Sequence, residues 1–329
     1  MKTKPNESQW AVLAGLRFLL ATLVVITHSA IVAPGSVLDK MFGNTGYPAV
    51  FGFLMISGYS IGSSITDRPE GYVYRRFKRI YPAYVIAIAI AFAVTLFGPL
   101  RLPGGQVIAQ PTPGTIIGNL LMMQGILVPV MPTDGALWSL SIEWWCYMAG
   151  AILFRLGNRV AQIVTITSFV VMMLYCEQTR TIGGTELPFG WIVPMMLWAW
   201  LAGFVYFREQ TKLNFSIMLF LPLIMFELIP RLQLASIVIA GSALTILFAG
   251  EIEIRSDKVR SVLNFLGNAS YPLYLLHAPI LFFIAARTSV RHGSLMIAIA
   301  VSVVLAGYYL TVSPINALRR KQKRQIRTI

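Results

Sequence analysis

The chain has 329 residues, of which 56% are hydrophobic and 12% are charged. A typical soluble domain carries about a quarter charged residues, so this composition excludes a soluble globular, a disordered and a collagen-like chain. The mean hydropathy of +0.69 predicts an all-α, polytopic integral membrane protein. The 27 basic and 13 acidic residues give a net charge of +14, which either marks cytoplasmic loops or serves a polyanion such as nucleic acid.

A membrane span needs roughly 20 mostly apolar residues, and about ten segments of that kind follow one another along the chain. A further apolar segment at 116–130 is short and interrupted by Gly and Pro, and we interpret it as an interfacial or re-entrant helix. The predicted spans are Trp10–Val32, Tyr47–Ile65, Tyr81–Gly98, Leu137–Phe154, Val160–Cys176, Gly190–Phe207, Leu213–Ile229, Leu234–Gly250, Tyr271–Ala286 and Ser294–Val312.

The basic residues are distributed unevenly among the loops between these segments. With the N-terminus in the cytoplasm, 20 of the 27 basic residues fall in internal loops and 6 in external loops. The positive-inside rule therefore predicts that both termini are cytoplasmic. We expect one membrane domain over residues 1–329, with a basic cytoplasmic tail at 319–329 and no appended soluble domain. Because the basic residues do not form one stripe, we expect no nucleic-acid partner.

Two ionisable residues share one face of the first span. Arg17 and His28 are eleven residues apart, which in a helix is three turns plus about 20°, so both side chains project in one direction about 16 Å apart. Ionisable groups inside a span are costly and often functional. The simpler interpretation is that Arg17 reaches the inner interface and His28 caps the helix end.

Two further ionisable residues lie in later spans. Glu143 is close to the outer start of the fourth span, and we expect it near the depth of His28, where a carboxylate strengthens an imidazole base if the two helices are neighbours. Its alternative role is a carboxylate favoured by the helix N-terminus. For His277, a hydrogen bond to a neighbouring helix is the simpler interpretation and catalysis the second.

A cluster of four cations lies just before the third span. Such clusters bind phosphate groups, although a topogenic loop that contacts anionic lipid headgroups has the same composition. The two cysteines are too few for a disulfide framework or a thiolate metal site, and we expect no metal. The cations are Arg75, Arg76, Lys78 and Arg79.

Five sequence blocks follow one another along the chain: Gly15-Leu16-Arg17 with His28, FGFLMISGYS at 51–60, RRFKRIYP at 75–82, WSLSIE at 138–143 and SYPLYLLH at 270–277. In this order they resemble the membrane-bound acyltransferase-3 family, whose members O-acylate bacterial surface polysaccharides, nodulation factors and some antibiotics. The sequence departs from the family pattern at Ala14, where an acidic residue is frequent, and at Cys146, where an aromatic residue is common.

The resemblance implies that an acyl group, acetyl by default, moves from cytoplasmic acyl-CoA to a hydroxyl of a cell-surface carbohydrate or its lipid-linked precursor. Arg17 and the four cations at 75–79 would bind the CoA phosphates. His28 would act as general base or transiently bear the acyl group, and Glu143 would orient it. Acyl-CoA is then a co-substrate rather than a bound cofactor. The expected supporting residues are Ser57, Trp138, Ser139, Tyr274 and His277.

The resemblance also implies a multi-pass protein of the bacterial inner membrane, in contact with membrane lipid and a carbohydrate acceptor, with association with polysaccharide-assembly proteins as a further option. The main alternative is a transporter or flippase for a lipid-linked sugar or drug. Transporters often show internal repeats and paired broken helices, and neither is evident here. A third interpretation is an inactive membrane sensor or scaffold, which would not need Arg17, His28 and Glu143 together.

Overall fold

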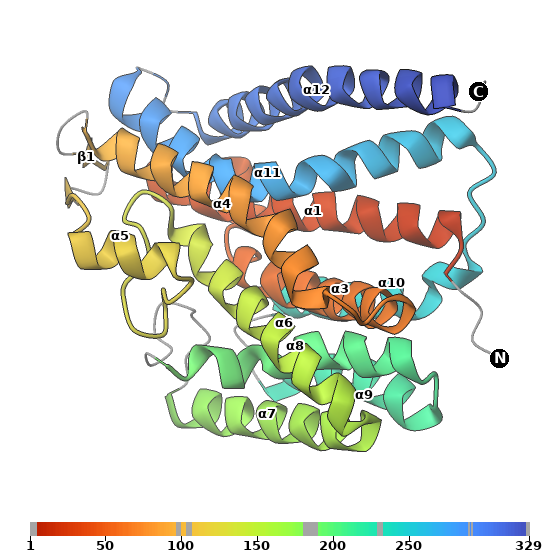
Figure 1. The fold of residues 1–329 in the computed structure, drawn as a ribbon. Helices are drawn as coiled ribbons and strands as arrows, with labels where there is room; N and C mark the ends of the chain where they lie inside the picture. Colours follow the sequence, from red (N-terminus) through yellow and green to blue (C-terminus); the bar gives the residue numbers. More distant parts are fainter. Residues whose placement is uncertain are drawn as a thin grey trace.

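The computed structural model describes residues 5–96, 100–102, 107–179, 190–228, 233–288, 290 and 292–326, and they form an almost entirely helical protein (Figure 1). Two short strands, β1 (Leu100–Arg101) and β2 (Val107–Ile108), pair antiparallel with Leu100 opposite Ile108. The α-helices are α1 (Glu7–Val32), α2 (Val37–Phe42), α3 (Gly46–Asp67), α4 (Tyr72–Leu96), α5 (Pro113–Leu120), α6 (Trp138–Leu156), α7 (Asn158–Thr179), α8 (Ile192–Arg208), α9 (Lys212–Leu228), α10 (Gln233–Phe248), α11 (Asp257–Arg287) and α12 (Gly293–Ile326).

Helices occupy all ten segments that the sequence marks as spans. Among the described residues, seven helices are long and apolar enough to cross a membrane: α1, α3, α4, α6 together with the preceding 3₁₀ turn η1 (Gly135–Leu137), α7, α11 and α12. Three shorter apolar helices cover Ile192–Arg208, Lys212–Met225 and Ile237–Glu251. The chain is therefore an all-helical, multi-pass membrane protein. The number of ten spans and the cytoplasmic placement of the termini stay predictions.

Local sequence explains several helix ends. The Asn6 side chain accepts a hydrogen bond from the Gln9 amide and begins α1, and Thr112 caps α5 in the same way ahead of Pro113. Gly157 has a φ of 95° and separates α6 from α7. The predicted helix at 116–130 is confirmed only at its start, because Met122 has a φ of 58°, which ends helical geometry after α5.

In the core, glycines allow the backbones of neighbouring helices to approach closely. On α3 and α8, a Cβ added at Gly58 would lie 1.7 Å from the Trp200 carbonyl oxygen, and one at Gly203 would lie 2.0 Å from the Met55 carbonyl oxygen. Helix α1 packs along α11, where a Cβ at Gly267 would lie 2.4 Å from the Cβ of Ala14. Helices α1, α3 and α11 thereby form the centre of the molecule, and five of the twelve predicted functional residues lie on them.

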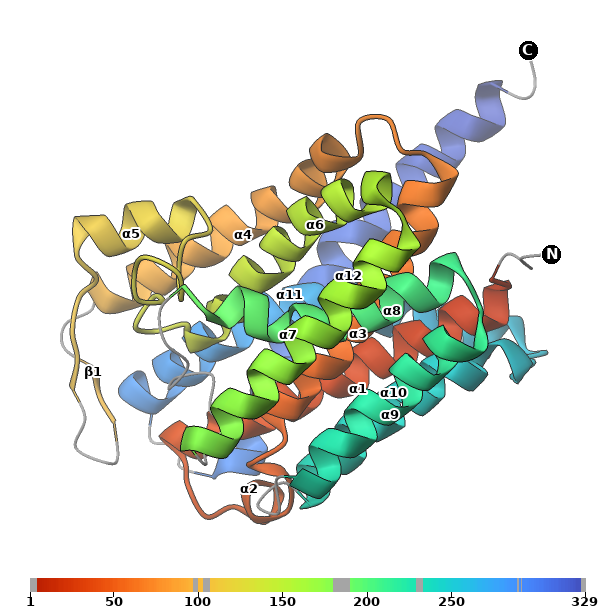
Figure 2. The same ribbon diagram turned by 90° about the horizontal axis from the view of Figure 1, so that it is seen from below.

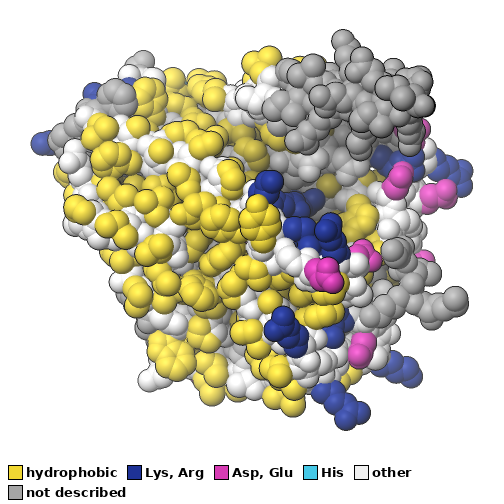
Figure 3. All heavy atoms as spheres, viewed as in Figure 1, with side chains coloured by type: hydrophobic (Ala, Val, Ile, Leu, Met, Phe, Trp, Pro, Cys, Tyr) yellow, Lys and Arg dark blue, Asp and Glu magenta, His cyan; other side chains and the backbone are white. Residues whose placement is uncertain are grey.

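The two ends of the molecule differ. Helix α1 begins and α12 ends on the same side, and α5 and β1 lie at the opposite side (Figures 1 and 2). Hydrophobic side chains cover most of the face in Figure 3, whereas the Lys, Arg, Asp and Glu side chains gather toward the side on which α1 begins. A broad apolar face with charges at one edge is typical of a protein that crosses a bilayer. The side chains of the predicted basic tail at 319–329 lie outside the described residues.

Candidate active site

A cavity of about 270 Å³ lies between α1, α3, α4, α6 and α11, and Tyr308 of α12 lies at its edge. Its lining is mixed, with arginines, hydroxyl groups and apolar side chains. Ligand sites of this size commonly combine an apolar wall with a few convergent polar groups. The polar and charged lining residues are Arg17, Ser57, Ser60, Arg76, Arg79, Ser139, Glu143, Tyr147, Asn268, Ser270, Tyr271, Tyr274 and Tyr308.

Three arginines give the cavity its positive charge. Arg17 enters from α1, and Arg76 and Arg79 enter from α4. The Nε atoms of Arg17 and Arg76 are buried and have no hydrogen-bond partner among the described residues. A buried donor without a partner is costly, so these two guanidinium groups are well placed to receive an anionic group of a ligand.

The four cations of the predicted phosphate-binding cluster lie on two different faces of α4. Arg75 and Lys78 do not line the cavity, and Arg75 donates instead to the backbone carbonyls of Glu70 and Arg68. Positions 76 and 79 share a helix face, whereas 75 and 78 lie on the adjacent face. The structure therefore brings only half of the cluster to Arg17.

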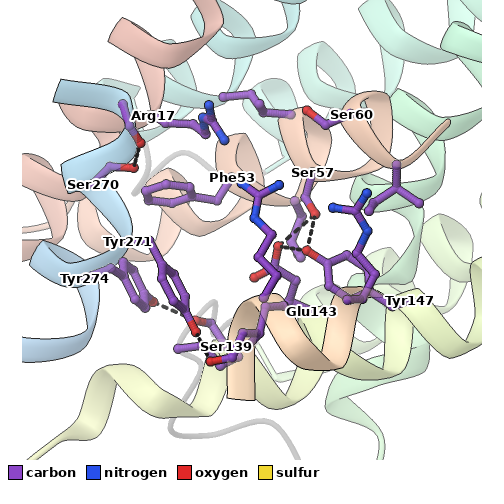
Figure 4. A pocket seen from close by; sticks show the side chains of 18 of the residues that line it. Arg17, Phe53, Ser57, Ser60, Ser139, Glu143, Tyr147, Ser270, Tyr271 and Tyr274 are labelled. Atoms are coloured by element: carbon purple, nitrogen blue, oxygen red, sulfur yellow. Dashed lines mark hydrogen bonds between the residues drawn. The ribbon is translucent and has the colours of Figure 1, made fainter. Parts of the chain in front are cut away.

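Glu143 lies inside the cavity among hydroxyl donors (Figure 4). Its Oε1 atom accepts hydrogen bonds from Ser57 Oγ at 2.8 Å and from Tyr147 Oη at 2.5 Å. Trp200 Nε1 in turn donates to Ser57 Oγ at 3.3 Å. Arg17 is within electrostatic reach of this carboxylate. Glu143 thus belongs to the arginine-lined part of the site, and its orientation is fixed by α3 and α6.

A pair of hydroxyl groups lines the cavity between α6 and α11. Ser139 Oγ and Tyr274 Oη are 2.6 Å apart and form a hydrogen bond, and both oxygens lie within 3.3 Å of the Ala136 carbonyl oxygen, which accepts from the hydroxyl that is not the donor in this bond. Figure 4 shows this pair beside Tyr271, with Ser139 next to Glu143 on the same helix. The Tyr274 ring also contacts His277, with ring centroids 5.9 Å apart. The cavity therefore extends to within one aromatic ring of a histidine.

His28 and His277 form a hydrogen-bonded pair. The distance between His277 Nε2 and His28 Nδ1 is 3.0 Å, and the ring centroids are 4.9 Å apart. Each Nδ1 atom also lies 3.0 Å from the carbonyl oxygen four residues earlier, Val24 for His28 and Leu273 for His277. His277 is fully buried and His28 is partly buried. The pair joins α1 to α11 beyond the end of the cavity.

Glu143 on α6 does not contact His28 on α1, so the structure does not show the contact that the sequence predicts between them. The residue of this helical segment that faces His28 is Gly135, where an added Cβ would lie 4.0 Å from His28 Nε2. Glu143 comes eight residues later, which is a rise of about 12 Å along the helix. Glu143 therefore lies near the level of Arg17 rather than that of His28, and the partner of His28 is His277.

Two polar residues in or near the site, Tyr147 and Asp134, are not among the residues that the sequence predicts for it. Tyr147 binds Glu143 and could have been found from its spacing of four residues on a helix. Asp134 is fully buried, and neither carboxyl oxygen has a hydrogen-bond partner among the described residues. It lies just before the span that begins at Gly135, and burial raises the pKa of its carboxyl well above the ordinary value.

Trp138, a predicted supporting residue, faces away from the cavity. Its ring stacks on Tyr47 at 5.6 Å with an interplanar angle of 22°. The other predicted supporting residues, Ser57, Ser139, Tyr274 and His277, lie in the cavity wall or in the histidine pair. No group of His, Cys, Asp or Glu able to hold a metal ion occurs within the described ranges.

Comparisons with known proteins identify the family of the chain. The model of a family described as an acyltransferase domain matches residues 10–313. The chain belongs to this acyltransferase-3 family. It is also 22% identical, over 239 residues, to a protein of Acidianus two-tailed virus named "Putative acetyltransferase ORF330", and the match covers 68% of each chain. No solved structure matches the chain. The protein is thus an acyltransferase of the membrane, as the five blocks predict.

Proposed function

We propose that this acyltransferase moves an acyl group from acyl-CoA, on the cytoplasmic side, to a hydroxyl of a surface carbohydrate or its lipid-linked precursor. One observation supports the proposal most strongly: a single cavity is lined by three arginines and also by Tyr274, whose ring contacts the histidine pair. A donor with phosphates at one end and a thioester at the other fits a site with this division. Acetyl is the expected acyl group, in keeping with the name of the viral relative.

In this proposal the cavity binds the donor. Arg17, Arg76 and Arg79 bind the CoA phosphates, and the unpartnered Nε atoms of Arg17 and Arg76 supply two of the donors. Glu143, fixed by Ser57 and Tyr147, holds the position of Arg17 and accepts hydrogen bonds from the donor's amide groups. The pantetheine arm then extends past Ser139 and Tyr274, and the thioester lies beside His28.

His28 acts as the general base. The proton of the acceptor hydroxyl moves to His28, the hydroxyl oxygen bonds to the carbonyl carbon of the thioester, and the carbon–sulfur bond breaks. The departing thiolate takes the proton from His28, so the products are an ester and free CoA. A positioned base of this kind contributes roughly 100-fold to 10,000-fold in rate. In the alternative route, the acyl group is bound covalently to His28 before it reaches the acceptor, and the products are the same.

The proposal places the protein in the bacterial inner membrane, where CoA is available on one side and surface glycans are assembled on the other. Association with polysaccharide-assembly proteins follows from that location. A transporter or flippase is disfavoured by the family to which the chain belongs. Uptake of an unmodified sugar by vesicles that contain the protein, without any acyl transfer, is the result expected of a transporter.

The test compares membranes that contain the wild type or His28→Ala, supplied with labelled acetyl-CoA, and follows acyl transfer by mass spectrometry of the glycans. We expect the wild type to add one acyl mass per repeating unit and His28→Ala to lose at least 100-fold in rate. His292→Ala, which alters an exposed histidine outside the site, is the matched control and should retain full activity. Full activity of His28→Ala would contradict the assignment of the base.

A further inference from the structure

The hydrogen bonds of the histidine pair determine where the protons lie. A backbone carbonyl only accepts hydrogen bonds, so His277 Nδ1, which lies 3.0 Å from the Leu273 carbonyl oxygen, bears a hydrogen. His277 is fully buried within α11, where a charged ring without a counter-ion is costly. A neutral ring with a hydrogen on Nδ1 leaves a lone pair on Nε2.

The same reasoning assigns the hydrogen positions of His28. The lone pair on His277 Nε2 accepts a hydrogen bond from His28 Nδ1, 3.0 Å away. The hydrogen on His28 Nδ1 also faces the Val24 carbonyl oxygen at 3.0 Å, which is consistent because both neighbours are acceptors. The reverse assignment would set the lone pair of His28 Nδ1 against a carbonyl oxygen and would require a cationic His277. His28 therefore has its free lone pair on Nε2, the atom that faces Gly135.

We propose that His277 is a positioning residue that fixes His28 in the tautomer with a basic Nε2 and stabilises the imidazolium formed during the reaction. This inference rests on the proposed function of His28 as general base. When His28 Nε2 takes the proton of the acceptor hydroxyl, the Nδ1 hydrogen stays shared with His277 Nε2, and this bond strengthens because its donor is now charged. The proton then leaves from Nε2 to the thiolate, and His277 is neutral before and after.

Other titratable groups face the pair from the neighbouring elements. Tyr274 of α11 contacts the His277 ring. Asp134 directly precedes Gly135, the residue nearest to His28 Nε2, and acts electrostatically on Tyr274. Glu143 binds Ser57 and Tyr147 instead. Among the described residues, His277 is thus the titratable group that forms a hydrogen bond with His28.

Two substitutions at position 277 separate positioning from packing. His277→Phe keeps a ring and removes the acceptor, whereas His277→Gln supplies a carbonyl oxygen near the place of Nε2. We expect His277→Phe to lower kcat roughly tenfold to a hundredfold, with the KM for acyl-CoA unchanged. The acidic limb of its kcat profile should move to lower pH, because the His28 imidazolium loses its acceptor. His277→Gln should recover most of kcat and return the acidic limb of the kcat profile to the pH of the wild type. His292→Gln is the control.

A spectroscopic measurement tests the tautomer without any activity. The chain has three histidines, so comparing ¹⁵N-histidine NMR spectra of the wild type and of His292→Gln identifies the His292 signals and leaves those of His28 and His277. We expect both rings to bear hydrogen on Nδ1 and none on Nε2. A hydrogen on either Nε2 would overturn the inference, as would a His277→Phe variant with the kcat and pH profile of the wild type. If the wild type transferred no acyl group, the proposed function would fail while the NMR result still decided the tautomer.

Discussion

The partner of His28 shows what residue patterns reveal and what they miss. The spacing of Arg17 and His28 predicts a shared helix face, and Arg17 does line the cavity. The partner of His28 is 249 residues away in the chain, and no local pattern specifies such a contact. The sequence pattern predicts that Glu143 lies at the depth of His28. The structure instead separates their levels by about 12 Å, because eight residues of helix lie between Glu143 and Gly135, the residue that faces His28.

Arg17 provides a test of donor binding. Arg17→Lys keeps the charge and loses the planar fork that holds a phosphate with two parallel bonds. We expect the KM for acyl-CoA to rise about tenfold, equivalent to about 1.4 kcal/mol, with little change in kcat. Arg208→Lys is the matched control, because Arg208 also has a buried, unpartnered nitrogen but lies outside the cavity. An unchanged KM in Arg17→Lys would remove Arg17 from the phosphate site.

Asp134 provides a test that links pH to stability. Burial raises the pKa of its carboxyl, so the folded state binds more protons than the unfolded state at pH values between the unfolded and folded pKa. Stability therefore falls as pH rises through that interval. Asp134→Asn removes the ionisable group and keeps the shape. In thermal unfolding in detergent, we expect the variant to be more stable than the wild type at neutral pH and the difference to shrink toward about pH 4. Lower stability of the variant at neutral pH would show that the carboxylate has a stabilising partner.

At the scale of elements, hydropathy predicts where the helices lie, because a long apolar segment in a membrane must satisfy its backbone polar groups and a helix does so within the segment. It predicted a helix at 116–130, where the chain forms only the short α5 before Met122 and Gly125 adopt positive φ. That loop folds inward instead, and Asn119, Gln124 and Asp134 are all fully buried. An apolar count does not distinguish residues buried against protein from residues that face lipid.

The contact between α3 and α8 depends on two glycines that have no room for a side chain. A methyl group at Gly58 would meet the Trp200 carbonyl oxygen at 1.7 Å, so the helices must separate to accept it. We expect Gly58→Ala to destabilise the protein by about 1–3 kcal/mol and to lower its Tm in detergent. Gly241→Ala, on α10, is the control, because no atom lies within 4 Å of the added group and alanine favours a helix. Equal Tm values for the two variants would contradict this packing.

For the whole molecule, charge distribution predicts that both termini face one side of the membrane. Helix α1 begins and α12 ends at the same side of the molecule, which agrees with that arrangement (Figure 2). Epitope tags at the two ends should therefore become accessible to antibody together when intact spheroplasts are permeabilised. Accessibility of one tag before permeabilisation would require an odd number of crossings.

The central claim is that the donor enters at the end of the molecule with the termini and that transfer takes place at the histidine pair toward the other end. Proteoliposomes of known orientation test it most directly, with labelled acetyl-CoA added only outside and a lipid-linked glycan as acceptor. Vesicles with outward-facing termini should label the glycan, and vesicles with inward-facing termini should not. Labelling only when the termini face inward would contradict the account.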